Sequence, residues 1–182
     1  MEIFPDGSVR GRTTEYILTH PKKKIKVTEI ARELAVSKGH VSEVISDLKK
    51  EGIVKKSMVD LTNPYVRALK IAININKIKK SGVISKIRSL GIEKAGLYGS
   101  WANGNNTEES DIDIWVKPDD VMKGIDIAKL SDNIRKTLKI EPQIVVLSEE
   151  KLKRLKEDNE VFYFTLVLGS IILMGEGIGR TG

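Results

Sequence analysis

One short segment, residues 111–116, constrains the fold more than any other part of the sequence. Its letters, DIDIWV, alternate charged and apolar residues with the period of two that is typical of a β-strand. Asp111 and Asp113 therefore lie on one face, and Ile112 and Ile114 point to a core on the other. Two carboxylates so close repel each other unless a cation lies between them, and oxygen ligands suit Mg²⁺ or Mn²⁺ rather than zinc.

Strands and helices alternate through the part of the chain that contains this segment. Strand patterns cover residues 95–98, 112–116, 143–147 and 170–174; helical patterns cover residues 121–138 and 149–167, the second interrupted near 158–159. This alternation predicts the α/β (α+β) fold class, with a mixed sheet and packed helices. The nearly uncharged run 161–174, VFYFTLVLGSIILM, is too short to span a bilayer as a helix, and we expect it to be buried core.

The first third of the chain has a different pattern, of short helices followed by a hairpin. Helices are expected over residues 13–20, 29–35 and 38–50, and strands over 53–54 and 58–59. Thr28 and Ser37 stand where N-caps of the second and third helices are expected. Two further helices are predicted over residues 64–78 and 83–90, the first with Pro64 in its first turn.

The letters EIARELAVSKGHVSEVISDLKKEGIV, residues 29–54, resemble the winged-helix members of the helix-turn-helix superfamily. Ala35 stands where many members have glycine. The resemblance implies that residues 38–50 form a recognition helix for the DNA major groove and that residues 53–61 form the wing. Glu43 and Asp47 on the exposed face weaken that interpretation, and protein interaction remains the alternative role. The DNA-binding residues that the resemblance implies are Lys38, His40, Ser42, Ser46, Lys50, Lys55 and Lys56.

A second resemblance rests on residues 97–116, LYGSWANGNNTEESDIDIWV. The segment contains a strand that ends in Gly-Ser and, about ten residues later, Asp-x-Asp on a second strand. This arrangement resembles the DNA polymerase β-like nucleotidyltransferase superfamily, and the compact size of the domain resembles the minimal members of that superfamily. The resemblance implies that Asp111 and Asp113 are catalytic and bind two divalent ions, Mg²⁺ or Mn²⁺, that bridge a nucleoside triphosphate. It also implies that Gly99 and Ser100 bind the phosphates of that nucleotide.

Active members of this superfamily usually carry a third carboxylate on a later strand. Gln143 stands at that position here, in EPQIVVL. Its neutral amide cannot act as a base and cannot offer a metal ion a charged ligand. Glu141 lies two residues earlier, but Pro142 is expected to begin the strand and leave it outside. Either Glu141 serves as the third catalytic carboxylate, or the domain binds nucleotide and turns over poorly. Trp115 shares the face of the two aspartates, where it packs against a helix or stacks near a base.

Charge is distributed unevenly along the chain. The formal net charge is +6 over 182 residues, but residues 67–94 alone carry +7 and residues 95–182 carry −4. This pattern argues against a uniformly basic protein that binds nucleic acid nonspecifically. The absence of cysteine excludes disulfide scaffolds and thiolate zinc sites.

These observations predict two domains, a winged helix over residues 1–66 and a nucleotidyltransferase domain over residues 67–182. The predicted function is Mg²⁺-dependent transfer of a nucleoside monophosphate, AMP if the donor is ATP, to a hydroxyl of a small molecule or of a protein such as a toxin partner. The alternative is a DNA-binding transcriptional regulator whose second domain only senses nucleotide or is inert. We expect a cytoplasmic protein without a membrane partner, and a homodimer is compatible with the sequence.

Overall fold

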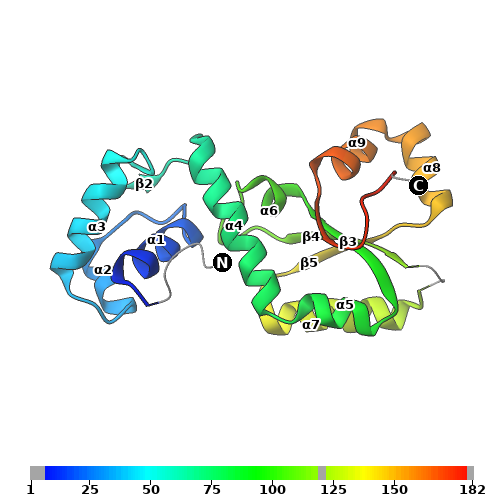
Figure 1. Cartoon of the computed structure of the whole chain (residues 1–182), viewed down its shortest axis with the longest axis horizontal. Coiled ribbons are helices and arrows are strands. Elements are labelled where there is room, and N and C mark those ends of the chain that lie inside the picture. Colours follow the sequence, from blue (N-terminus) through cyan, green and yellow to red (C-terminus); the bar gives the residue numbers. More distant parts are fainter. Residues whose placement is uncertain (1–6, 119–121, 180–182) are drawn as a thin grey trace. The chain divides into compact units, whose positions relative to one another are not determined.

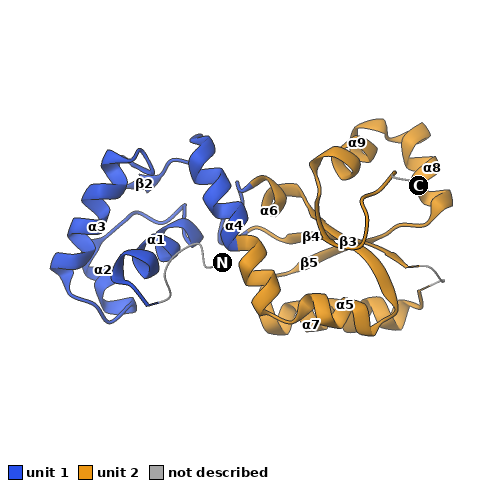
Figure 2. Ribbon diagram, in the orientation of Figure 1, with its two compact units in different colours: residues 1–73, 104–109 blue, residues 74–103, 110–182 orange. Residues whose placement is uncertain are grey.

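The computed structural model describes residues 7–118 and 122–179, which form two compact units (Figure 2). The first unit comprises Met1–Ile73 and Gly104–Glu109, and the second comprises Asn74–Asn103 and Ser110–Gly182. Each has its own hydrophobic cluster of buried residues. The start of the helix that was predicted to begin at residue 121 lies outside the described residues.

The first unit consists of helices and a two-stranded hairpin (Figure 1). Its core is formed by one face of each helix, and α3 contributes Val41, Val44, Ile45 and Leu48. The elements are α1 (Val9–Thr19), α2 (Val27–Glu33), α3 (Lys38–Lys50), β1 (Val54–Lys55), antiparallel β2 (Met58–Val59) and the beginning of α4 (Pro64–Lys80).

Helix α3 confirms the predicted bounds, and Ser37 caps it by accepting a hydrogen bond from the His40 amide at 3.2 Å. The predicted Thr28 cap is wrong, because α2 begins at Val27 and Thr28 lies inside it. Lys26 occupies the N-cap position without a side-chain hydrogen bond. The preference of threonine for N-cap positions therefore did not decide where this helix begins. Ala35 adopts φ +52°, a left-handed conformation that glycine adopts without strain.

The second unit is a four-stranded sheet in the order β5-β4-β3-β6, with helices on both faces (Figure 1). Strand β4 is antiparallel to β3 and parallel to β5, and β6 is antiparallel to β3, so the sheet is mixed as predicted. Its elements after α4 are α5 (Val83–Ser89), β3 (Ile92–Tyr98), α6 (Gly99–Asn103), β4 (Ile112–Pro118), α7 (Gly124–Leu138), β5 (Pro142–Val146), α8 (Glu149–Asp158), α9 (Glu160–Gly169) and β6 (Ile171–Met174).

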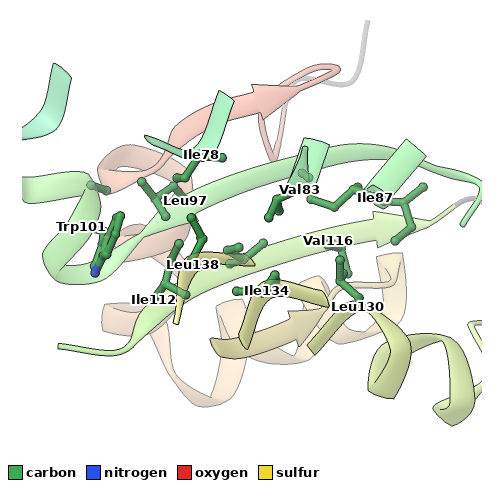
Figure 3. Packing of buried hydrophobic residues seen from close by; sticks show 14 residues of the cluster. Ile78, Val83, Ile87, Leu97, Trp101, Ile112, Val116, Leu130, Ile134 and Leu138 are labelled. Atoms are coloured by element: carbon green, nitrogen blue, oxygen red, sulfur yellow. The ribbon is translucent and has the colours of Figure 1, made fainter. Parts of the chain in front are cut away.

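The two faces of this sheet bury different clusters. Ile112, Ile114 and Val116 of β4 pack with α5 and α7 in the larger cluster, which Figure 3 shows. Trp115 of β4 points to the opposite face, where it packs with Leu152 of α8 and Leu166 of α9. The alternation read from the sequence therefore separates a purely apolar face from the face that carries the two aspartates.

The expectation that residues 161–174 form buried core is wrong for most of helix α9. Leu166 is buried, but Val161 is 81% exposed, Leu168 is 78% exposed and Phe164 is also exposed. The run is apolar all round, whereas only one side of a surface helix can face the sheet, so its other side is left in solvent. None of the helices within the described residues combines the length and apolarity that a bilayer crossing requires.

Candidate functional site

The two aspartates lie at the beginning of β4, between β3 and β5. Asp113 is the register partner of Tyr98 in β3 and of Gln143 in β5, and Asp111 immediately precedes the strand. Both carboxylates are half-buried. Burial raises the pKa of Asp113, and the negative charge of Asp111 raises it further. The protein therefore holds two like charges next to each other where water screens them only partly.

The Gly-Ser turn lies directly against Asp113. Gly99 follows the last residue of β3 and adopts φ +66°, which lets the chain turn into α6. A Cβ atom placed on Gly99 would lie 2.2 Å from Oδ2 of Asp113 and 3.0 Å from its Cγ. Ser100 is the next residue in α6, so the structure brings Gly99 and Ser100 together with Asp113.

Helix α6 is held by residues that the sequence analysis did not single out as functional. The Asn74 side-chain amide donates a hydrogen bond to the Trp101 carbonyl at 2.9 Å, and the Lys77 ammonium lies 5.7 Å from the centre of the Trp101 ring. Asn74 and Trp101 are both buried. The apolar pattern alone gave no signal for Asn74, because its partner is a backbone group 27 residues away.

Tyr98 and Trp115 lie in the buried cluster on the same face of the sheet as Asp113. Burial raises the pKa of Tyr98 to about 12, with a further contribution from the Asp113 charge, so its hydroxyl stays protonated. Trp115 is fully buried, and its indole N–H donates a hydrogen bond to the Ser170 hydroxyl at 3.0 Å. Trp115 therefore packs in the core, which was one of its two predicted roles, and does not present its ring to solvent.

Gln143 reaches the aspartates and Glu141 does not. The Gln143 side-chain amide donates a hydrogen bond to Oδ2 of Asp111 at 2.9 Å. Glu141 instead forms a two-pronged ion pair with Arg135 of α7, at 2.6 and 2.8 Å, and this pair lowers the pKa of Glu141. Because α7 covers the other face of the sheet, Arg135 holds Glu141 away from the site.

The donor set of this site fits a divalent cation that also has phosphate ligands. Asp111 and Asp113 supply carboxylate oxygens only, which Mg²⁺ and Mn²⁺ prefer. Within the described residues, no group of three His, Cys, Asp or Glu side chains is placed to hold a metal on its own. Mg²⁺ is commonly held by one or two carboxylates together with substrate phosphates, so the pair suffices if a nucleotide provides the remaining ligands.

The residues predicted to contact DNA lie on the surface of the first unit. All seven are exposed: Lys38, His40, Ser42, Ser46 and Lys50 on α3, and Lys55 and Lys56 on the hairpin. The acidic Asp47 of α3 is paired with Arg10 at 3.2 Å and with Lys50 at 3.3 Å. These ion pairs offset one of the two negative charges that weakened the DNA-binding interpretation.

Comparison with known proteins identifies the family of the second unit. A family model described as polymerase beta, nucleotidyltransferase matches residues 76–173. This match covers more than half of the chain, and the chain therefore belongs to the polymerase β nucleotidyltransferase family. No curated protein matches the chain.

Several solved structures of toxin–antitoxin complexes are similar to the chain. A mutant MntA complex has 21% sequence identity, covering 56% of this chain and 73% of its own, with a TM-score of 0.43. A complex with AMP-PNP has 25% identity, covering 57% and 74%, with a TM-score of 0.42. A complex of a tri-AMPylated HEPN toxin and its MNT antitoxin, from Shewanella oneidensis, has 21% identity, covering 58% and 73%, with a TM-score of 0.40.

Proposed function

We propose that the second unit transfers a nucleoside monophosphate from a nucleoside triphosphate, with ATP as the first candidate, to a hydroxyl group of an acceptor. The observation that carries this proposal is the contact between the Gly99 turn and the Asp113 carboxylate. A phosphate that accepts hydrogen bonds from the turn's N–H groups would lie within reach of a cation on Asp111 and Asp113. This arrangement serves phosphoryl chemistry, in which positioning and charge neutralisation provide most of the acceleration.

In the proposed reaction the acceptor hydroxyl loses its proton to water and its oxygen bonds to the α-phosphorus. The bond from that phosphorus to the α,β-bridging oxygen breaks, and pyrophosphate leaves. Gly99 and Ser100 would hold the leaving phosphates, and Asp111 and Asp113 would hold Mg²⁺ or Mn²⁺. A divalent ion, when bound, neutralises charge on the phosphates. Gln143 orients Asp111 through its amide but cannot accept the acceptor's proton as a carboxylate would.

We favour a protein acceptor, of the kind represented by a toxin partner, over a small molecule. The exposed apolar side of α9 supports this choice, because contiguous exposed apolar side chains such as Val161, Phe164 and Leu168 are typical of protein contact sites.

Transfer is tested by incubating the full chain with Mg²⁺, ATP labelled at the α-phosphate, and a candidate protein acceptor. We expect covalent labelling of the acceptor and release of unlabelled pyrophosphate. In the Asp111→Asn/Asp113→Asn variant we expect labelling to fall by about 10³-fold, because the cation ligands lose their charge. Equal labelling by this variant and the wild-type chain would overturn the assignment of the site.

Gln143 provides a second test, in which activity is expected to increase. Gln143→Glu keeps the shape of the side chain and adds a third carboxylate beside Asp111, so we expect transfer to rise at least about tenfold with Mg²⁺. Without metal the added like charge should lower the melting temperature, and Mg²⁺ should restore it. The matched control Glu141→Gln should leave transfer unchanged, since Arg135 holds Glu141 elsewhere. Loss of transfer in the control, with no gain in Gln143→Glu, would make Glu141 the third carboxylate.

We further propose that residues 1–66 form a winged-helix module that binds DNA. The exposure of Lys38, Lys50, Lys55 and Lys56 supports this role. Fluorescence anisotropy with a short DNA duplex should show affinity falling steeply between about 50 and 200 mM salt. Lys55→Ala/Lys56→Ala should reduce the salt dependence. Affinity that does not depend on salt or on these lysines would favour protein interaction instead.

The alternative function, a DNA-binding regulator with an inert second unit, predicts salt-dependent DNA binding without any labelling of an acceptor. The carboxamide at position 143 favours this alternative, because it leaves the site one carboxylate short of the usual set. The labelling and anisotropy experiments together separate the two functions.

A further inference from the structure

A cavity of about 270 Å³ lies in the second unit, apart from the aspartates. Strands β3 and β4, helices α8 and α9, and the chain segment after β6 contribute to its walls. Four lysines line it, together with the Tyr163 ring and the glycine-containing segment 177–179: Lys94, Lys117, Lys153 and Lys156. A single carboxylate, Glu149, is also part of the lining.

Buried residues on the same face of the sheet separate this cavity from the proposed nucleotide site. Lys117 follows Asp113 by four residues on β4, so the two side chains share a face and their Cα atoms are about 13 Å apart along the strand. Trp115 lies between them, fully buried and packed against Gly96. A molecule bound at the Asp pair therefore does not fill this cavity.

Two lysines of the cavity lie directly opposite each other in the sheet. Lys94 and Lys117 are direct register partners across the antiparallel β3 and β4 strands, where like charges repel. Both side chains are mostly covered, at 32% and 22% exposure, which reduces screening by water. Lys94 pairs with Glu176 at 3.7 Å, and Lys117 forms an ion pair with Glu149.

Helix α8 adds two more positive charges to the same space. Lys153 and Lys156 are three residues apart and so lie on neighbouring positions of one helix face. Neither makes an ion pair with any residue in 7–118 or 122–179. The pKa of Glu149 is lowered by Lys117 and, to a smaller extent, by Lys94, as expected for a carboxylate within a positive region. Four lysines thus line one cavity, and only Lys94 and Lys117 are paired with carboxylates there, those of Glu176 and Glu149. Lys153 and Lys156 are exposed on α8.

We propose that this cavity is a second binding site, specific for a small phosphate-bearing anion. Phosphate oxygens can accept hydrogen bonds from several ammonium groups at once, and charge-assisted bonds of this kind are the strong ones. Binding would relieve the repulsion between Lys94 and Lys117. The volume suits one pyrophosphate or one mononucleotide at most, because ligand pockets of about 300 Å³ lie at the small end of the usual range. The site would bind its ligand whether or not the Asp pair catalyses transfer.

The experiment uses the full chain carrying Asp111→Asn/Asp113→Asn, without Mg²⁺, so that metal-bridged binding at the Asp pair is removed. Pyrophosphate, AMP and adenosine are titrated separately by isothermal calorimetry at low salt. We expect one pyrophosphate or AMP to bind per chain and adenosine not to bind. Tighter binding of pyrophosphate would identify a free anion as the ligand, and tighter binding of AMP a nucleotide. Absence of binding by both phosphates would overturn the proposal.

Two variants locate the site. Lys153→Ala/Lys156→Ala in the same background should weaken binding at least about tenfold, because two charge-assisted contacts are lost. Lys79→Ala/Lys80→Ala removes the same charge from exposed positions on α4 and should leave affinity within about twofold. Equal loss in both variants would indicate only a general charge effect and contradict the site.

An independent measurement does not rely on a lysine variant. In an NMR titration with pyrophosphate, the backbone amides of Gly177 and Gly179 should shift, while that of Gly99 should stay in place. Shifts confined to Gly99 and its neighbours would assign the anion to the nucleotide site and overturn the proposal.

Discussion

Replacing Gly99 by alanine is expected to reduce nucleotidyl transfer by about 10²-fold or more while the second unit stays folded. The added Cβ would lie 2.2 Å from Oδ2 of Asp113, so the carboxylate must move. Because the clashing atom is at the end of a flexible side chain, the carboxylate can move aside with little loss of folding stability. The same movement takes it away from the position that transfer requires. The measurement is the initial rate of acceptor labelling, together with thermal unfolding followed by tryptophan fluorescence.

Gly91→Ala is the matched control for this prediction. Gly91 also has a positive φ, +71°, but a Cβ there meets no atom within 4 Å. Both variants carry the left-handed strain of an alanine, about 1 kcal/mol, and only Gly99→Ala displaces the carboxylate. Full activity in Gly99→Ala, or an equal loss in Gly91→Ala, would contradict the proposed role of the turn.

Replacing Gly96 by alanine is expected to destabilise the second unit by about 3 kcal/mol. Its Cβ would lie 2.4 Å from Cε2 and Nε1 of Trp115 and 2.5 Å from Cζ2. The Trp115 ring is fully buried and hydrogen-bonded to Ser170, so displacing it would disturb the surrounding core and this hydrogen bond. Urea unfolding followed by tryptophan fluorescence measures the effect, because both tryptophans of the chain lie in the second unit.

The clash is tested by a double-mutant cycle with Trp115→Leu. If the methyl group and the ring compete for the same space, the double variant should be more stable than the sum of the two single effects predicts, by about 1 kcal/mol or more. Gly169→Ala, where a Cβ meets no atom within 4 Å, should change stability by less than about 1 kcal/mol. Additive single effects would show that Gly96 acts through something other than Trp115.

The sequence predicted those helices and breaks that depend on interactions within a few residues of the chain. Ser37 and the buried stripe of α3 are set by residues within one helix, and the structure has this helix with the predicted bounds. The break in the helical pattern near Asn159 is also local, because the Asn159 side chain accepts a hydrogen bond from the Phe162 amide and so caps α9. The exposed side of α9 could not be predicted, because burial depends on what packs against a helix.

The sequence by itself determined that Asp111 and Asp113 share one face of a strand and that a Gly-Ser turn precedes them, because strand alternation and glycine chemistry act over a few residues. Only the tertiary structure decided which later side chain reaches the pair. Gln143 bonds to Asp111, whereas Arg135 of α7 holds Glu141, although both follow from the same alternating pattern. The Gln143–Asp111 contact joins residues 32 positions apart, and the Arg135–Glu141 pair, although only six positions apart, depends on how α7 packs beside β5. Spacing along the chain encodes neither contact.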